Sequence, residues 1–107
     1  MGKLTKCVAV TSCPAGAVHT QMASQALAKE AKKLGIEFQV ESQGAFGVTN
    51  ELRQQDINDA QLVIFAADIA IADQERFSGK KILKVSTPEA IGEPGQVFRK
   101  AEALLEE

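Results

Sequence analysis

Apolar, strand-like segments alternate with helix-like segments along most of this 107-residue chain. Residues 4–12 and 61–67 form nearly continuous apolar runs, which are typical of strands covered on both faces. Residues 36–41 alternate apolar and polar, as in a strand near a sheet edge, and residues 80–85 predict a fourth strand. The alternation predicts an α/β fold: a small four-stranded parallel sheet in the order 2-1-3-4, with helices on both faces in a Rossmann-like, three-layer arrangement.

Helical periodicity is clearest over residues 20–34, where apolar side chains recur every three or four residues and Gly35 follows as a stop signal. The polar stretch 42–50 is predicted to be a loop. Weaker patterns predict three further helical segments, at 51–60, at 69–77 and, as an amphipathic helix, at 96–107. One domain, residues 1–107, accounts for the whole sequence.

Composition excludes several classes of function. The net charge is -2 and five Phe are the only aromatic residues, so a basic groove with stacking side chains for nucleic acid is not expected. The longest apolar run, residues 62–67, is far shorter than the roughly 20 residues of a membrane span. The amino terminus carries no cleavable apolar segment, so we expect a cytoplasmic protein without membrane insertion. Because the cytoplasm is reducing, the two cysteines of the chain, Cys7 and Cys13, are not expected to form a disulfide.

The turn after the first strand is the candidate site, because ligands of open parallel sheets bind beyond the carboxyl ends of strands. It has no acidic residue, so consecutive backbone N–H groups are free to converge on an anion. Cys13 stands at the strand end, where the following helix favours a thiolate. We interpret Cys13 as a nucleophile that forms a phosphocysteine, the alternative being a small buried cysteine. The predicted phosphate loop comprises Pro14, Ala15, Gly16, Ala17, Val18, His19 and Thr20.

Each neighbouring candidate has a functional and a structural interpretation. His19 either donates to a phosphate oxygen or packs the loop, and Thr20 is predicted to cap the helix, with a phosphate contact as a further role. Gln43 and Gly44, near the same sheet edge, either touch the phosphate or a partner, or satisfy loop backbone. Asp68 would repel a phosphocysteine, so its first interpretation is an N-cap for the following turn, with a partner or phosphate contact as the alternative.

A missing arginine separates this loop from that of cysteine phosphatases. In those enzymes five residues separate the nucleophilic cysteine from an arginine, and here the corresponding position is His19. Without a guanidinium clamp on the transferring phosphoryl group, hydrolysis is disfavoured and a carrier is favoured. A zinc site is not expected, because there is no second His and Cys7 lies inside a strand. No cofactor is predicted.

The loop sequence 13–20, followed by Met22, Ala23 and an Ala-rich helix, resembles the active loop of the fructose-type enzyme IIB component of the bacterial sugar phosphotransferase system. The resemblance extends over nearly the whole chain, through residues 40–44, 56–57, 66–70, 76–80 and 85–91. Ala15 and Val18 depart from the Thr and Ala that are common in the family, which affects fine specificity.

The resemblance implies a phosphotransferase of the cytoplasm. Cys13 matches the family's phosphorylated cysteine, which accepts a phosphoryl group from a phosphohistidine of a IIA partner. It then passes that group to a sugar, fructose or fructose-like, that a membrane IIC partner carries inward. The chain's length suggests a separately encoded IIB protein. The alternative functions are a passive anion-binding regulatory module and a low-activity cysteine phosphatase.

Overall fold

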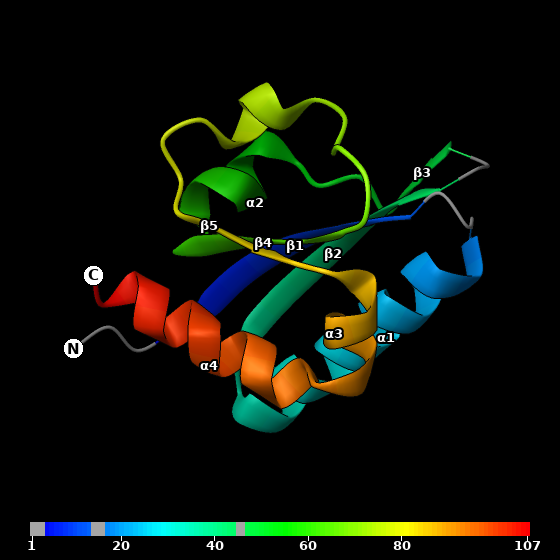
Figure 1. Ribbon diagram of the computed structural model, residues 1–107. Coiled ribbons are helices and arrows are strands. Elements are labelled where there is room, and N and C mark those ends of the chain that lie inside the picture. Colours follow the sequence, from blue (N-terminus) through cyan, green and yellow to red (C-terminus); the bar gives the residue numbers. More distant parts are fainter. Residues whose placement is uncertain (1–3, 14–16, 45–46) are drawn as a thin grey trace.

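The computed structural model describes residues 4–13, 17–44 and 47–107 and shows a sheet with helices on both faces (Figure 1). The sheet has five strands in the order β3-β2-β1-β4-β5. The strands are β1 (Lys6–Ser12), β2 (Glu37–Gly44), β3 (Gly47–Thr49), β4 (Leu62–Ala67) and β5 (Ile82–Val85). The helices are α1 (Ala17–Leu34), α2 (Gln54–Asp59), the single turn η1 (Gln74–Phe77), α3 (Thr87–Gly92) and α4 (Pro94–Leu105).

The predicted parallel sheet is confirmed in part. The four strands β2, β1, β4 and β5 are parallel and lie in the predicted order. The prediction of only four strands was wrong, because β3 pairs antiparallel with β2 and makes the sheet mixed. Residues 42–50 are therefore not simply a loop. The pattern missed β3 because three exposed residues are too short to show a period of two, and polar edge strands lack a buried face.

Alternate side chains of the central strand β1 enter two separate cores. Cys7 and Ala9 point into a core with α1, α3 and α4, whereas Val8 and Val10 point into a core with α2 and η1. The helices lie on the corresponding sides of the sheet in Figure 1. This arrangement confirms the predicted three layers and leaves the ends of the strands as the place for a site.

The predicted helices are present with shifted bounds: α2 is shorter than 51–60, only the turn 74–77 forms within 69–77, α4 begins two residues before 96, and α1 and α3 differ most. α1 begins at Ala17 rather than at residue 20, so Thr20 lies in the first turn of the helix and is not its N-cap. α3 was not predicted; Ser86 caps it by accepting a hydrogen bond from the Glu89 N–H at 3.2 Å. The predicted end of α1 is confirmed: Gly35 has a φ of 74°, and Ile36 N–H donates to Ala31 O at 2.9 Å. No helix in the described ranges is long and apolar enough to span a bilayer.

Candidate functional site

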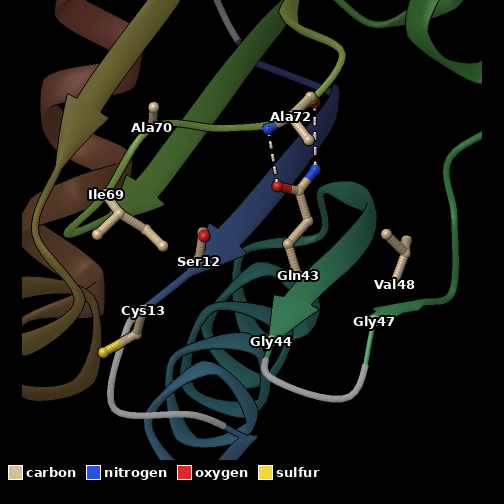
Figure 2. Close-up of a pocket in the computed structure, with 9 residues that line it drawn as sticks. All are labelled: Ser12, Cys13, Gln43, Gly44, Gly47, Val48, Ile69, Ala70 and Ala72. Carbon is tan, nitrogen blue, oxygen red and sulfur yellow. Dashed lines mark hydrogen bonds between the residues drawn. The ribbon is translucent and has the colours of Figure 1, made fainter.

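Cys13 directly follows β1, at the edge of the sheet where the parallel strands end. It belongs to neither apolar core, although only 5% of its surface is exposed. It lines a cavity of about 350 Å³, and Figure 2 shows its Sγ directed away from Gln43. The other lining residues are Ser12, Gln43, Gly44, Gly47, Val48, Ile69, Ala70 and Ala72. The sulfur is thus recessed at the strand end rather than enclosed among core side chains.

The structure describes four of the seven residues of the predicted phosphate loop. Pro14, Ala15 and Gly16 lie outside the described residues, so the convergence of their N–H groups stays a prediction. Ala17 and Val18 form the first residues of α1. This helix has 18 residues and no acidic side chain in its first turn, so its partly positive end lies close after Cys13 in the chain.

His19 is the member of the predicted loop that contacts Cys13 in the described part of the chain. Its Nδ1 lies 3.6 Å from Cys13 Sγ, and its side chain is exposed. Thr20 is buried, and its backbone oxygen accepts a hydrogen bond from Thr11 Oγ1 at 3.4 Å. The structure therefore brings His19 to the thiol, while the backbone of Thr20 links α1 to β1.

Asp68 lies beside Cys13 because it follows the neighbouring strand. Its N–H donates to Ser12 O at 2.9 Å, which continues the pairing of β4 with β1. Its carboxylate accepts two hydrogen bonds from Thr87, from the N–H at 3.1 Å and from Oγ1 at 2.6 Å. The carboxylate is therefore bound to the start of α3, whereas the sequence first suggested a cap for the turn that follows Asp68.

The pKa of Asp68 is lowered from its ordinary value. The hydrogen bonds from the side chain and backbone of Thr87 are the main causes, and burial opposes them weakly. A hydrogen bond from the Cys13 thiol and the charge of His19 contribute less. Asp68 is thus an ionised group in contact with the candidate nucleophile.

Gln43 forms the opposite wall of the cavity. Its Oε1 accepts from Ala72 N–H at 2.9 Å, and its Nε2 donates to Ala72 O at 3.3 Å, as Figure 2 shows. The side chain satisfies loop backbone, one of the two roles predicted for it. Gly44 lines the cavity beside it. Contact of either residue with a phosphate or a partner stays a prediction.

Sequence reasoning missed the charged pair behind this wall. Glu41 is 1% exposed and accepts hydrogen bonds from Arg76 Nη1 at 2.9 Å and Nη2 at 3.0 Å. It also accepts from Leu52 N–H at 2.9 Å and from Gln43 Nε2 at 2.9 Å. Burial alone would raise the pKa of Glu41, but these hydrogen bonds outweigh it and lower the pKa. No local signal could have found Glu41, because it occupies a polar position of the alternating strand, as the exposed Glu37 and Gln39 do.

Three hydroxyl groups connect the elements that surround Cys13. Thr11 Oγ1 lies 3.0 Å from Ser24 Oγ and 3.1 Å from Ser42 Oγ, and the two serine oxygens lie 2.8 Å apart. These residues come from β1, α1 and β2. Since each hydroxyl both donates and accepts, the cluster satisfies itself and fixes α1 against the sheet just below the site.

Cys7 has the environment predicted for an apolar filler. It is 1% exposed in the core beneath α1, and burial raises the pKa of its thiol to about 12. Cys13 is thus the better candidate nucleophile of the two free cysteines. The described side chains include no group of three or more His, Cys, Asp or Glu suited to a metal ion.

Comparison with known proteins identifies the family. Residues 8–100 match the family model described as the PTS system, lactose/cellobiose specific IIB subunit, where PTS is the sugar phosphotransferase system. The chain belongs to the PTS IIB family. This confirms the resemblance drawn from the sequence.

Its relatives assign this IIB domain to the fructose type. It is 44% identical over 102 residues to the PTS system fructose-like EIIB component 2 of Escherichia coli K12, covering 95% of this chain and 96% of that protein. The fructose-specific EIIABC component of Bacillus subtilis is 44% identical over 96 residues, 90% of this chain but 15% of that protein. Although the family description names lactose and cellobiose, we follow these relatives, because their similarity extends over nearly the whole chain.

Solved structures agree in fold. A domain of the fructose-specific IIABC component from Borrelia burgdorferi is 42% identical with a TM-score of 0.88, covering 94% of this chain and 96% of that one. A predicted fructose-specific IIB from Escherichia coli is 32% identical with a TM-score of 0.91, covering 97% and 92%. The chain is therefore a PTS IIB domain of fructose type, a family of phosphotransferases for sugar transport.

Proposed function

We propose that this IIB domain carries a phosphoryl group on Cys13, between a phosphohistidine of a IIA partner and a sugar carried by a membrane IIC partner. The observation that supports Cys13 is its place: it directly follows β1, lines a cavity and contacts both His19 and Asp68. Cys7, on the same strand, is enclosed in the core with a pKa of about 12. A IIB domain of this type works in the cytoplasm, where IIA and the inner face of IIC meet it.

The chemistry is two successive displacements at phosphorus. The Cys13 sulfur attacks the phosphohistidine, the S–P bond forms as the P–N bond breaks, and the departing imidazole takes up the proton that the thiol gives up. A sugar hydroxyl oxygen then attacks, the O–P bond forms as the S–P bond breaks with its electron pair on sulfur, and the hydroxyl proton goes to this thiolate and restores the Cys13 thiol. Both steps need hydrogen-bond donors for the phosphoryl oxygens, which we assign to the loop 14–20.

His19 favours transfer over hydrolysis. It stands where cysteine phosphatases have an arginine, and a single ring N–H cannot grip two phosphoryl oxygens as a guanidinium does. A phosphocysteine without that clamp persists until a better-placed acceptor arrives. We therefore assign His19 one hydrogen bond to the phosphoryl group and no part in activating water.

Phosphorylation measured by intact mass tests this proposal. On incubation with a phosphorylated IIA protein of fructose type, the wild-type chain is expected to gain the mass of one phosphoryl group. Cys13→Ser is expected to gain none, because a serine hydroxyl is far less nucleophilic than a thiolate. Cys7→Ala is the matched control, because it removes the other thiol and leaves the site intact, and it is expected to be phosphorylated as the wild type is.

Two outcomes would overturn the proposal. If the wild type gained no mass but bound inorganic phosphate with Cys13 unmodified, the loop would be a passive anion site of a regulatory module. If the isolated chain instead turned over an aryl phosphate through Cys13, the protein would be a cysteine phosphatase. Transport assays with the matching IIC protein and a panel of sugars would then identify the substrate of the carrier.

A further inference from the structure

Asp68 and Cys13 hold equivalent positions on adjacent parallel strands. Ser12 and Ala67 are register partners, and each is followed by one of these two residues. The hydrogen bond from Asp68 N–H to Ser12 O, 2.9 Å long, carries the pairing one step beyond the strands. Neighbouring residues in register project to the same face of a sheet, so this geometry places the Asp68 carboxylate next to the Cys13 thiol.

The carboxylate is fixed from a third element. Both of its hydrogen bonds from Thr87 come from the first residue of α3, and Thr87 is 1% exposed. Thr87 follows Ser86, whose side chain caps α3. The position of the charge beside Cys13 is therefore set by a buried residue 19 positions away in the sequence.

Among the residues that the structure describes, no lysine or arginine pairs with Asp68. In the ranges that the structure describes, the ion pairs involve Glu37, Asp59, Asp56, Glu41 and Glu89, and none involves Asp68. Besides Asp68, the titratable group in contact with Cys13 in those ranges is His19. In that part of the chain, the titratable neighbours of the Cys13 thiol are thus an imidazole and a carboxylate.

The lowered pKa of Asp68 separates two roles for this carboxylate. A general base works best when its pKa lies near the working pH, and that of Asp68 is displaced in the opposite direction. Asp68 is therefore poorly suited to take the thiol proton for long. It is well suited to remain a constant negative charge through the whole reaction cycle.

We propose that Asp68, held by Thr87, is a positioning residue that disfavours the anionic states of Cys13. At rest, the thiol donates its hydrogen bond to the carboxylate, whereas a thiolate would lose that bond and face a like charge. After phosphorylation, the same charge raises the free energy of the phosphocysteine dianion. The phosphoryl group is then less stable on sulfur and passes on more readily, a consequence that rests on the proposed carrier function.

Alkylation of Cys13 by iodoacetamide tests the resting-state part without any partner protein. Asp68→Asn keeps the size of the side chain and removes its charge, so the Cys13 alkylation rate at neutral pH is expected to rise about tenfold. The pH profile of the rate is expected to move to lower pH, a change that a purely structural role would not produce. Peptide mapping assigns the modified cysteine.

A matched control isolates the position of the charge. Asp59→Asn makes the same change in net charge, but Asp59 pairs with Lys6 at the opposite end of β1. It is expected to leave the alkylation rate and its pH profile unchanged. An equal rise in both variants, or none in Asp68→Asn, would overturn the proposal.

Thr87 variants test the positioning. Thr87→Val removes the hydroxyl donor, so the exposed carboxylate is expected to turn toward solvent and the alkylation rate to rise about threefold. Thr87→Ser keeps the donor and is expected to restore the wild-type rate. A rate in Thr87→Val equal to or below the wild type would contradict the role of Thr87.

Phosphorylation tests the second part separately. The phosphorylated and unphosphorylated IIA protein are mixed at a fixed ratio and left to reach equilibrium with the chain. The ratio of phosphorylated to unphosphorylated chain is then expected to be several-fold higher for Asp68→Asn than for the wild type, because the repulsion by Asp68 is gone. If neither protein is phosphorylated, the carrier function fails while the alkylation result still decides the effect on the thiol. If both are phosphorylated to the same extent, the carrier function stands and the effect of Asp68 on phosphocysteine is refuted.

Discussion

Two carboxylates near the candidate site differ in their burial and in the charge of their partners. Glu41, on β2, is 1% exposed and receives donors from Arg76, Leu52 and Gln43. Asp68, after β4, is exposed and receives its hydrogen bonds from the side chain and backbone of Thr87. The pKa of each is lowered, but in Glu41 a cation is involved and in Asp68 the main donors are uncharged.

The difference indicates that one carboxylate at this edge of the sheet contributes mainly to stability and the other mainly to the electrostatic field at Cys13. A buried charge needs a partner of opposite sign, and once paired it has little effect on groups around it. A charge fixed by uncharged donors keeps its field and imposes it on its neighbours. We infer that Glu41 holds the cavity wall in place, whereas Asp68 acts on the sulfur.

Removing Arg76 is expected to have the largest effect on the difference between the two carboxylates. Arg76→Met leaves Glu41 buried without its cation, so the free energy of unfolding is expected to fall by about 3–5 kcal/mol. Urea unfolding followed by circular dichroism measures this loss. Arg99→Met is the control, because Arg99 is exposed on α4 and bonds only Gln96 among the contacts of the described residues; its effect is expected to stay within about 0.5 kcal/mol. Similar losses in the two variants would show that the buried pair has no special role.

Gln43 connects the charged pair to the cavity, so its removal has a smaller effect on both. Gln43→Ala takes one donor from Glu41 and leaves Ala72 N–H without its acceptor, and the expected cost is about 1–3 kcal/mol of unfolding free energy. Transfer of the phosphoryl group from IIA is expected to slow as the wall loosens. Gln39→Ala, at an exposed position on the same strand, is the control and is expected to change neither quantity. Equal effects of both alanines would contradict the bridging role of Gln43.

The parts of the fold that follow from local patterns could be predicted. The continuous apolar runs predicted the parallel strands, Gly35 marked the end of α1, and the position of Cys13 after the first strand marked the candidate site. Each of these signals lies within a few residues of the feature it predicts. The edge strand β3 and the early start of α1 were missed because each adds only three residues, too few to show a periodicity.

The two carboxylate networks could not be predicted for a different reason. Glu41 and Arg76 are 35 residues apart, and Asp68 and Thr87 are 19 apart. Such pairs form only when the sheet order brings distant loops together, and no local spacing records them. The sequence therefore identified Asp68 as a candidate but not its partner, and it did not identify Glu41 as a candidate at all.

The pH dependence of the free energy of unfolding is the smallest effect expected to distinguish the two carboxylates. A carboxyl whose pKa is lowered by folding contributes stability at neutral pH, and that contribution is lost as the pH falls below its ordinary value, about 4.3 for Glu, toward the lowered one. For Glu41 the lowering depends on Arg76, so the stability gap between the wild type and Arg76→Met is expected to narrow as the pH falls through this range.

Asp68 is exposed and screened by water, so its contribution is expected to be much smaller. Asp68→Asn is expected to lose less than about 1 kcal/mol of unfolding free energy at neutral pH and to follow nearly the same acid profile as the wild type. Urea unfolding at a series of pH values measures both profiles. If Asp68→Asn flattened the profile as much as Arg76→Met, Asp68 would be a stabilising carboxylate like Glu41. Its negative charge would then be explained by folding, and a role beside Cys13 would no longer be needed to account for it.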